Sequence, residues 1–280
     1  MKYFLFVLLF VINFTLKAQY WFGPKVGFHR ASFEYDEATY KTDSFNVNSS
    51  FGFQAGGVFI YEATKMYSVQ TEITYKRVTK SMTSRLPSPV ITNNTFNYLS
   101  VPFLLRVSLG REPVHYYVGG GPEINIWLGG KGDIKLDEFA EGPVGVLDEE
   151  DNLYKRNYDF VFRQSKSNDD QWAITSANRV QYTLTAVAGV YLDLRTKGRL
   201  LFEGKYMWGH SNFGFNDNPD FTWDSYYENF ENRINMASMS VTYLFQYDAK
   251  EAKKGMSTIP ASNRKEIKVE KKDKKEKKKG

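Results

Sequence analysis

The sequence predicts an all-β protein, an eight-stranded antiparallel transmembrane β-barrel that is followed by a disordered basic tail. Three observations predict this fold. Eight segments alternate apolar and polar side chains with the period of two that is typical of a β-strand. The connections between these segments alternate strictly between long and short. The amino terminus has the apolar run of a secretory signal, which directs a chain out of the cytoplasm.

The first element is the amino-terminal run at residues 1–18, MKYFLFVLLFVINFTLKA, which joins Lys2 to an apolar stretch and ends in Ala18 before Gln19. Such a pattern is typical of a cleaved secretory signal, and the run is short for a membrane helix of about 20 residues. We therefore expect the barrel domain to cover residues 19–247. The sequence contains no cysteine, so no disulfide framework is expected.

The eight alternating segments are each long enough to cross a bilayer as a tilted strand of roughly 9 to 11 residues. They cover residues 20–33, 50–62, 66–80, 96–109, 114–128, 180–195, 200–212 and 233–247. In the third segment Val69 and Ile73 share one face, and Glu72 lies on the other. One face of each segment therefore suits lipid, and the other suits a polar interior.

The fourth segment, LSVPFLLRVSLG, has one wholly apolar face that includes Leu99 and Phe103. Its other face contains Ser100, Pro102 and Arg106. Pro102 argues against a helix because proline lacks the backbone donor and clashes with the preceding turn. In a closed barrel the missing donor is awkward as well, and we expect a local bulge at Pro102.

Aromatic residues gather near the expected ends of the segments, as in the aromatic belts at the two membrane interfaces. The sequence predicts Trp21, Tyr243, Phe245 and Tyr247 at one interface and Trp127, Tyr206 and Trp208 at the other.

The connections give the strongest evidence for the fold. The long ones cover residues 34–49, 81–95, 129–179 and 213–232, and the short ones cover 63–65, 110–113 and 196–199. Bacterial outer-membrane barrels have short periplasmic turns, longer outer loops and an even number of strands. We therefore expect the protein in the bacterial outer membrane, in contact with its lipid, with both termini in the periplasm.

Charged residues of the polar faces are expected to form a network in the lumen. These residues are Lys25, Glu72, Arg106, Glu123, Asp193, Glu203 and Lys205. Eight strands enclose an interior that side chains just fill, and opposite charges can pair there. The sequence therefore predicts a plugged lumen without a diffusion pore, and no cofactor or metal site.

The tail at residues 248–280 holds thirteen basic and six acidic residues, whereas the barrel segment is mildly acidic. It has too few large apolar residues to fold alone. We expect its lysines to bind a periplasmic protein, or anionic cell-wall or lipid headgroups, and not nucleic acid; the alternative is a tail that is merely solvated. They are Lys268, Lys271, Lys272, Lys274, Lys275, Lys277, Lys278 and Lys279.

Two neighbouring motifs resemble those of the Bacteroidetes outer-membrane β-barrel family that is often labelled PorT-like. The matching residues are Tyr98, Leu99, Val101, Pro102, Leu104, Leu105 and Arg106, then Gly120, Gly121 and Pro122, and the junction of Ala18 with Gln19. The resemblance covers roughly residues 19–247 and implies fold and compartment. Some family members are implicated in type IX secretion, which implies accessory work in protein export. The acidic third outer loop and the basic tail depart from the family pattern.

The leading hypothesis is a non-enzymatic barrel that serves as an interaction or scaffold subunit of an outer-membrane complex. One alternative is transport, as a secretion accessory or a small-solute channel. Another is a lipid-modifying enzyme with His210 as base and Ser211 as nucleophile, although adjacent strand residues point to opposite faces.

Two further alternatives concern ligands and fold. The acidic stretches at 148–151 and 216–220 could bind calcium through oxygen ligands, but solvated acidic loops are commoner. A soluble lipocalin-like barrel would turn the apolar rows of residues 99–109 and 182–194 toward a ligand cavity. The many charges on the opposite faces argue against that arrangement.

Overall fold

The computed structural model describes residues 19–35, 45–84, 90–136, 146–148, 153–162, 170–174, 176–194, 198–214 and 230–247. The chain divides into two units, residues 1–246 and 247–280, and of the second unit only Tyr247 is described. The expected signal and basic tail lie outside the described residues. No helix in the described ranges is long and apolar enough to cross a membrane.

One sheet of twelve strands makes up the described fold. The strands are β1 (Gln19–Tyr35), β2 (Phe45–Ser49), β3 (Phe51–Glu62), β4 (Tyr67–Ser84), β5 (Ile91–Arg111), β6 (Val114–Leu136), β7 (Val146–Asp148), β8 (Leu153–Val161), β9 (Gln171–Ala173), β10 (Val180–Asp193), β11 (Gly198–Gly209) and β12 (Asn232–Tyr247).

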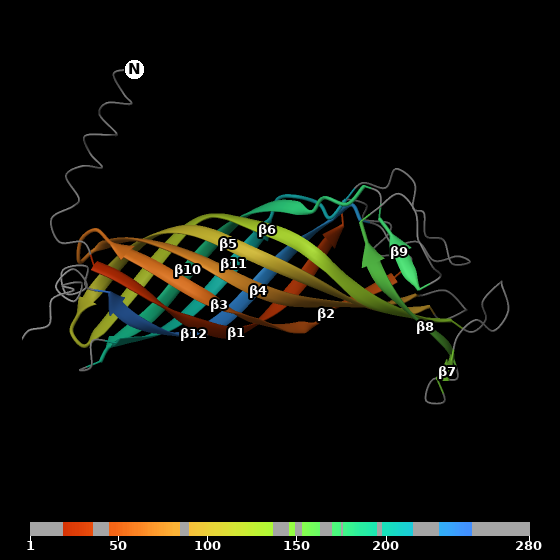
Figure 1. Ribbon diagram of the computed structural model, residues 1–280, viewed down its shortest axis with the longest axis horizontal. Helices are drawn as coiled ribbons and strands as arrows, with labels where there is room; N and C mark the ends of the chain where they lie inside the picture. Colours follow the sequence, from red (N-terminus) through yellow and green to blue (C-terminus); the bar gives the residue numbers. More distant parts are fainter. Residues whose placement is uncertain are drawn as a thin grey trace, which may run out of the picture. The chain divides into compact units, whose positions relative to one another are not determined.

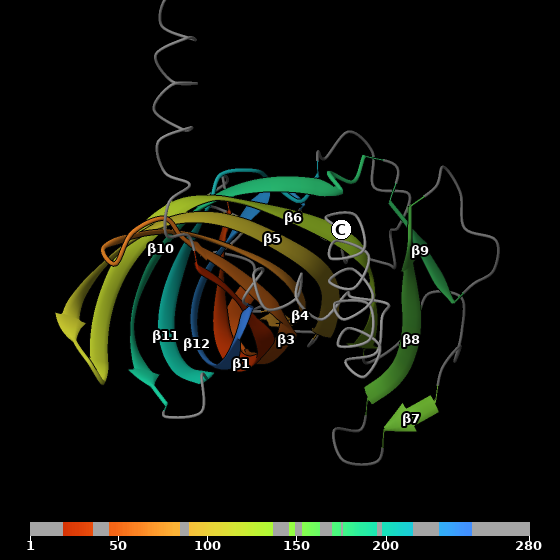
Figure 2. The ribbon, with the colours of Figure 1, turned by 60° about the vertical axis from the view of Figure 1, so that its left-hand side comes forward.

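Eight of these strands close into a ring in the order β1, β3, β4, β5, β6, β10, β11 and β12. The pairing of β10 with β6 and that of β12 with β1 complete the ring (Figure 2). Each expected segment corresponds to one strand of this ring. The eight-stranded antiparallel barrel that the sequence predicts is therefore confirmed.

Strand β5 has the two faces that its sequence predicts. Leu105 is 69% exposed on the outer wall, whereas its neighbours Leu104 and Arg106 are buried in the lumen. The expected bulge at Pro102 is wrong. Against β4, the pairs Thr71 with Phe103 and Thr74 with Ser100 keep one register, so no residue is inserted there.

The observed bulge lies closer to the long-loop end of β5. The register of β5 against β6 shifts between Asn97 and Tyr98, which pair with Gly129 and Trp127. Leu128 is therefore the extra residue of β6. Gly129 next to it has a φ of 142°, a left-handed conformation that glycine adopts without strain.

The outer wall carries an apolar band of membrane thickness. On β4 the outward side chains from Tyr67 to Tyr75 are mostly apolar, and Arg77 follows them on the same face. On β5 the apolar row lies between Leu109 and Leu99, and polar Asn97 follows it. These lengths match the roughly 9 to 11 residues of a membrane-crossing strand.

The aromatic belts are confirmed in part. Tyr206 and Trp208 lie on the outer wall with ring centroids 4.6 Å apart, and Phe245 and Tyr247 are exposed at the opposite end. The prediction is wrong for Trp21 and Trp127, which are only 4% and 0% exposed and point into the lumen. They share the inward face of Lys25 and Glu123, which lie an even number of residues away.

Strands β7, β8 and β9 lie beyond the eight-stranded ring at its long-loop end (Figure 1). The described part of the expected loop at 129–179 is largely strand: β6 continues to Leu136 and pairs with β8 over Gly130–Leu136 and Tyr154–Phe160. β7 and β9 pair with β8. Most inward side chains of this extension are apolar, among them Ile134 and Phe160, and Arg156 is a buried charged exception. These inward side chains are buried against the mouth of the barrel, and this burial stabilises strands in a segment where the sequence predicts a loop.

Replacement of Leu105 by arginine tests the position of the apolar band. The charge would face lipid, so the free energy of unfolding in liposomes should fall by about 2 to 4 kcal/mol. Thr95→Arg on the same outer face, beyond the band, should cost about 0 to 1 kcal/mol. Equal losses in denaturant titrations of the two variants would contradict a membrane-spanning band.

Candidate functional site

A charge quartet of Lys25, Glu72, Glu203 and Lys205 lies in the lumen, and its side chains are at most 2% exposed except that of Lys205, which is 9% exposed. Lys25 Nζ lies 2.9 Å from Glu72 Oε2 and 2.6 Å from Glu203 Oε1. Lys205 Nζ lies 2.6 Å from Glu72 Oε1 and 3.3 Å from Glu203 Oε1. Each ammonium therefore contacts both carboxylates, and the quartet as a whole is neutral.

Neutral side chains surround the quartet and donate to its carboxylates. Tyr117 donates its hydroxyl hydrogen to Glu203 Oε2 at 2.7 Å, and Gln70 Nε2 donates to the same oxygen at 3.0 Å. Gln70 also donates to Glu72. Arg106 Nη1 donates to Gln70 Oε1, and the guanidinium lies 3.6 Å from the Tyr117 ring centroid. Arg106 thus joins the network through Gln70 rather than through a carboxylate.

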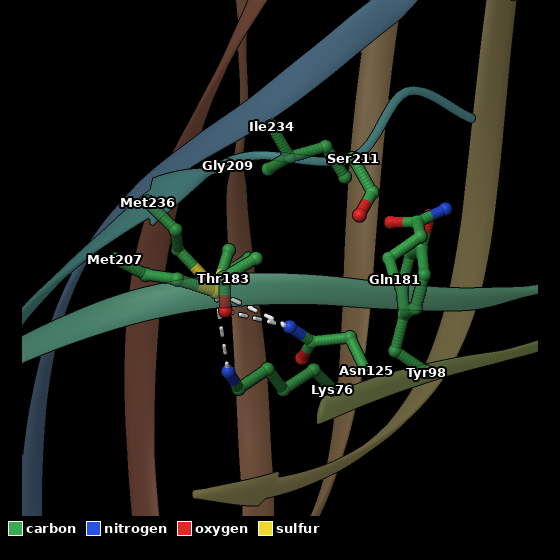
Figure 3. A pocket seen from close by; sticks show the side chains of 10 residues that line it. All are labelled: Lys76, Tyr98, Asn125, Gln181, Thr183, Met207, Gly209, Ser211, Ile234 and Met236. Carbon is green, nitrogen blue, oxygen red and sulfur yellow. Dashed lines mark hydrogen bonds between the residues drawn. The ribbon is translucent and has the colours of Figure 1, made fainter. Parts of the chain in front are cut away.

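A second ion pair lies toward the long-loop end. Lys76 Nζ is 2.5 Å from Glu123 Oε1, and Thr185 Oγ1 donates to Glu123 Oε2 at 2.8 Å. Figure 3 shows Lys76 and Asn125 directed toward Met207 and Thr183. The hollow between these side chains leaves ≈ 10 Å³ for the centre of a water molecule, about the room of a single water.

The short-turn end of the lumen is closed by a floor group of Glu62, His115, Asp193 and Arg199. Arg199 forms ion pairs with Glu62 and with Asp193. Its guanidinium also stacks over Trp21, 3.8 Å from the ring centroid. His115 Nε2 lies 3.1 Å from Asp193 Oδ2. These contacts tie β1, β3, β6, β10 and the start of β11 together across the barrel.

The long-loop end is filled by an aromatic cap. Its rings belong to Phe33, Phe96, Trp127, Phe160, Trp172, Phe213 and Phe230, which are all buried in one cluster. The ring centroid of Phe96 lies 5.1 Å from that of Phe213 and 5.3 Å from that of Phe160. Ring separations of this size are those of packed aromatic pairs. The floor group, the charge quartet, the Lys76–Glu123 pair and the aromatic cap thus occupy the lumen.

The structure brings together most of the lumen residues that the sequence predicts. Lys25, Glu72, Glu203 and Lys205 form the quartet. Glu123 pairs instead with Lys76, which the predicted network omits. Lys76 lies four residues after Glu72, so the period of two assigns it to the lumen as well.

Asp193 lies apart from the other predicted network residues, in the floor group. Its partner Arg199 was missed because it lies in an expected turn, and Glu62, the other carboxylate that pairs with Arg199, was missed because it lies at a strand end. Only the closed ring brings these two positions together.

The remaining predicted sites fall into two classes. The tail lysines, the acidic stretch at 149–151 and that at 216–220 lie outside the described residues. In the part of the chain that the structure describes, no cluster of acidic or histidine side chains has the arrangement of a metal site. The expected base and nucleophile are described: His210 is exposed, and Ser211 Oγ accepts from Tyr182 N at 3.0 Å.

The match to a known protein family agrees with this architecture. The family model for the outer membrane protein beta-barrel domain matches residues 17–214. No curated protein matches the chain. The solved structure of the outer membrane protein OprG from Pseudomonas aeruginosa is similar at 12% identity and a TM-score of 0.48, over 83% of this chain and 98% of that one.

Two further solved structures are similar. Ail of Yersinia pestis, in complex with sucrose octasulfate, matches at 14% identity and a TM-score of 0.34, over 81% of this chain and 99% of that one. Neisserial surface protein A matches at 10% identity and a TM-score of 0.38, over 83% of this chain and 100% of that one.

Replacement of Glu203 by glutamine tests the charge quartet. Lys25 and Lys205 would then share Glu72 alone in a buried site, so the free energy of unfolding should fall by about 3 to 5 kcal/mol. Asp159→Asn is the control, because its pair with Lys131 is exposed and such pairs contribute about 0 to 1 kcal/mol. A comparable loss in urea titrations of the two variants would contradict the quartet.

Proposed function

Because the chain belongs to the outer membrane protein beta-barrel domain family, we propose that it is a closed barrel that works as a non-enzymatic interaction subunit of a complex in the bacterial outer membrane. The observation that carries the proposal is the occupied lumen. The floor group, the charge quartet and the aromatic cap fill the interior from one end to the other. A barrel of this kind acts through its ends and its outer surface.

The long-loop end supplies one such surface. Strands β4, β5, β6 and β8 carry polar outward side chains beyond the apolar band, including Asn93, Asp133 and Lys155. Asn93 Nδ2 donates to Asp133 Oδ2 at 3.2 Å, so neighbouring strands present an ordered polar face. In the proposed orientation this face is extracellular, since outer loops are the long ones in bacterial barrels.

The other surface is the short-turn end with the tail that follows it in sequence. We propose that both termini are periplasmic and that the tail lysines bind an acidic protein segment of the complex. Lysine-rich segments attract anionic surfaces through charge that is screened by salt. Anionic cell-wall polymers and lipid headgroups are the competing partners of the tail.

The proposal is also compatible with the resemblance to the PorT-like family, some members of which are implicated in secretion. An accessory of a secretion machine would be an interaction subunit, so the resemblance suggests one kind of complex. The non-enzymatic assignment draws support from the described pair at the end of β11. The Ser211 hydroxyl is engaged with backbone groups of Tyr182, and the exposed His210 makes no hydrogen bond to it among the described contacts.

Affinity purification from native membranes in mild detergent tests the interaction role. The full chain is compared with a chain that ends at Tyr247 and with a full-length chain in which the eight tail lysines from Lys268 to Lys279 are replaced by glutamine. A stoichiometric protein partner should co-purify with the full chain and be lost from both variants at moderate salt, because the tail lysines supply the attraction.

Two results would contradict the proposal. Recovery of no partner with the full chain would indicate an autonomous barrel. Recovery of the same partner with all three chains would remove the tail from the interaction and assign it to the barrel surface.

A further inference from the structure

Arg106 differs from the lysines around it in having no carboxylate partner. Lys25, Lys76 and Lys205 each have a carboxylate oxygen within 2.6 Å. Arg106 is only 3% exposed, and among the described residues no carboxylate forms an ion pair with it. Its contacts are the amide oxygen of Gln70 and the ring of Tyr117, neither of which offsets a full positive charge in a buried site.

The charge of Arg106 cannot be removed by loss of a proton, because a guanidinium stays protonated in proteins. The Arg106 Nε–H group is also buried and has no hydrogen-bond partner. A buried donor without an acceptor is costly, and more so when the donor is charged. The site therefore favours an acceptor that also carries a negative charge.

A second buried donor without an acceptor lies beside Arg106. Ser68 of β4 is the direct cross-strand partner of Arg106 in β5, and both side chains are buried on the lumen side. The Ser68 hydroxyl is buried and has no hydrogen-bond partner. Directly opposed residues have Cβ atoms about 4.5 to 5.5 Å apart. One acceptor placed between the two side chains can therefore receive hydrogen bonds from both.

A glycine on the neighbouring strand accommodates the stem of Arg106. Gly119 of β6 pairs with Arg106, and a Cβ atom at this glycine would lie 2.4 Å from the Leu105 backbone oxygen and 3.1 Å from Arg106 Cγ. The glycine thus allows the arginine stem to lie flat against β6. The floor group contains two carboxylates, Glu62 and Asp193, and one arginine, Arg199. Among the described contacts neither carboxylate accepts a hydrogen bond from Arg106.

We propose that Arg106 and Ser68 form an internal binding site for a small monovalent anion such as chloride. The anion accepts from Arg106 Nε and Ser68 Oγ and compensates the charge that the quartet leaves unpaired. A water molecule in the same place would satisfy the donors but not the charge. The bound anion stabilises the barrel. The site goes beyond the proposed interaction role, since it requires neither a protein partner nor the passage of ions through the lumen.

The test is the thermal unfolding midpoint in detergent micelles as sodium chloride replaces sodium gluconate at constant ionic strength. Gluconate is too large for a packed lumen. The midpoint of the unmodified protein should rise and saturate with chloride, whereas Arg106→Gln should lose the saturable rise. Ser68→Ala should weaken the apparent chloride affinity by about ten-fold, the effect of one hydrogen bond to a charged group.

Arg77→Gln is the matched control, because Arg77 is an exposed arginine on the outer face of β4 and should leave the chloride response unchanged. Crystals grown in bromide should give an anomalous peak between Arg106 and Ser68. No saturable response in the unmodified protein, or an equal response in Arg106→Gln, would overturn the proposal. If Arg106→Gln does not fold, an unchanged affinity in Ser68→Ala together with a bromide map that shows only water would overturn it.

Discussion

The buried ion pairs of the lumen are the constraint on which the rest of the barrel depends. A charged group that faces the inside of a membrane-embedded barrel must be paired with other groups of the barrel, because the desolvation of an unpaired charge is costly. Lys25 of β1 contacts Glu72 of β4 and Glu203 of β11, which are 47 and 178 residues away in sequence. The quartet therefore links strands across the lumen and favours the closed ring over an open sheet.

The same requirement divides the interior into levels. Polar side chains occupy the middle of the barrel, where the wall outside faces lipid. The aromatic cap occupies the mouth, where the wall extends beyond the apolar band and Phe96 and Trp127 pack against Phe160 of strand β8. Ion pairs in the middle and stacked rings at the mouth thus exclude solvent by different means. Arg106 is a buried lumen cation with which no carboxylate of the described residues forms an ion pair.

The period of two was sufficient to predict the eight strands and the direction of the lumen charges, because a closed barrel assigns each strand residue to one face. The same period places Trp21 and Trp127 on the lumen side. Their predicted place in the aromatic belts was wrong because it rested on residue type and not on the alternation of faces along the strand. The floor group could not be predicted, since Glu62 and Arg199 meet only when the ring closes. The β6 and β8 extension was missed because polar outward residues such as Lys131 and Lys155 resemble a loop.

The current through single molecules in planar lipid bilayers tests the closed lumen most directly. Insertion is verified by protease protection, and a porin reconstituted in parallel provides the positive control. The account predicts no steady open level at any applied voltage that the bilayer withstands, because the floor group, the quartet and the cap each fill the bore. A stable open level in the unmodified protein would contradict it and would favour a solute channel.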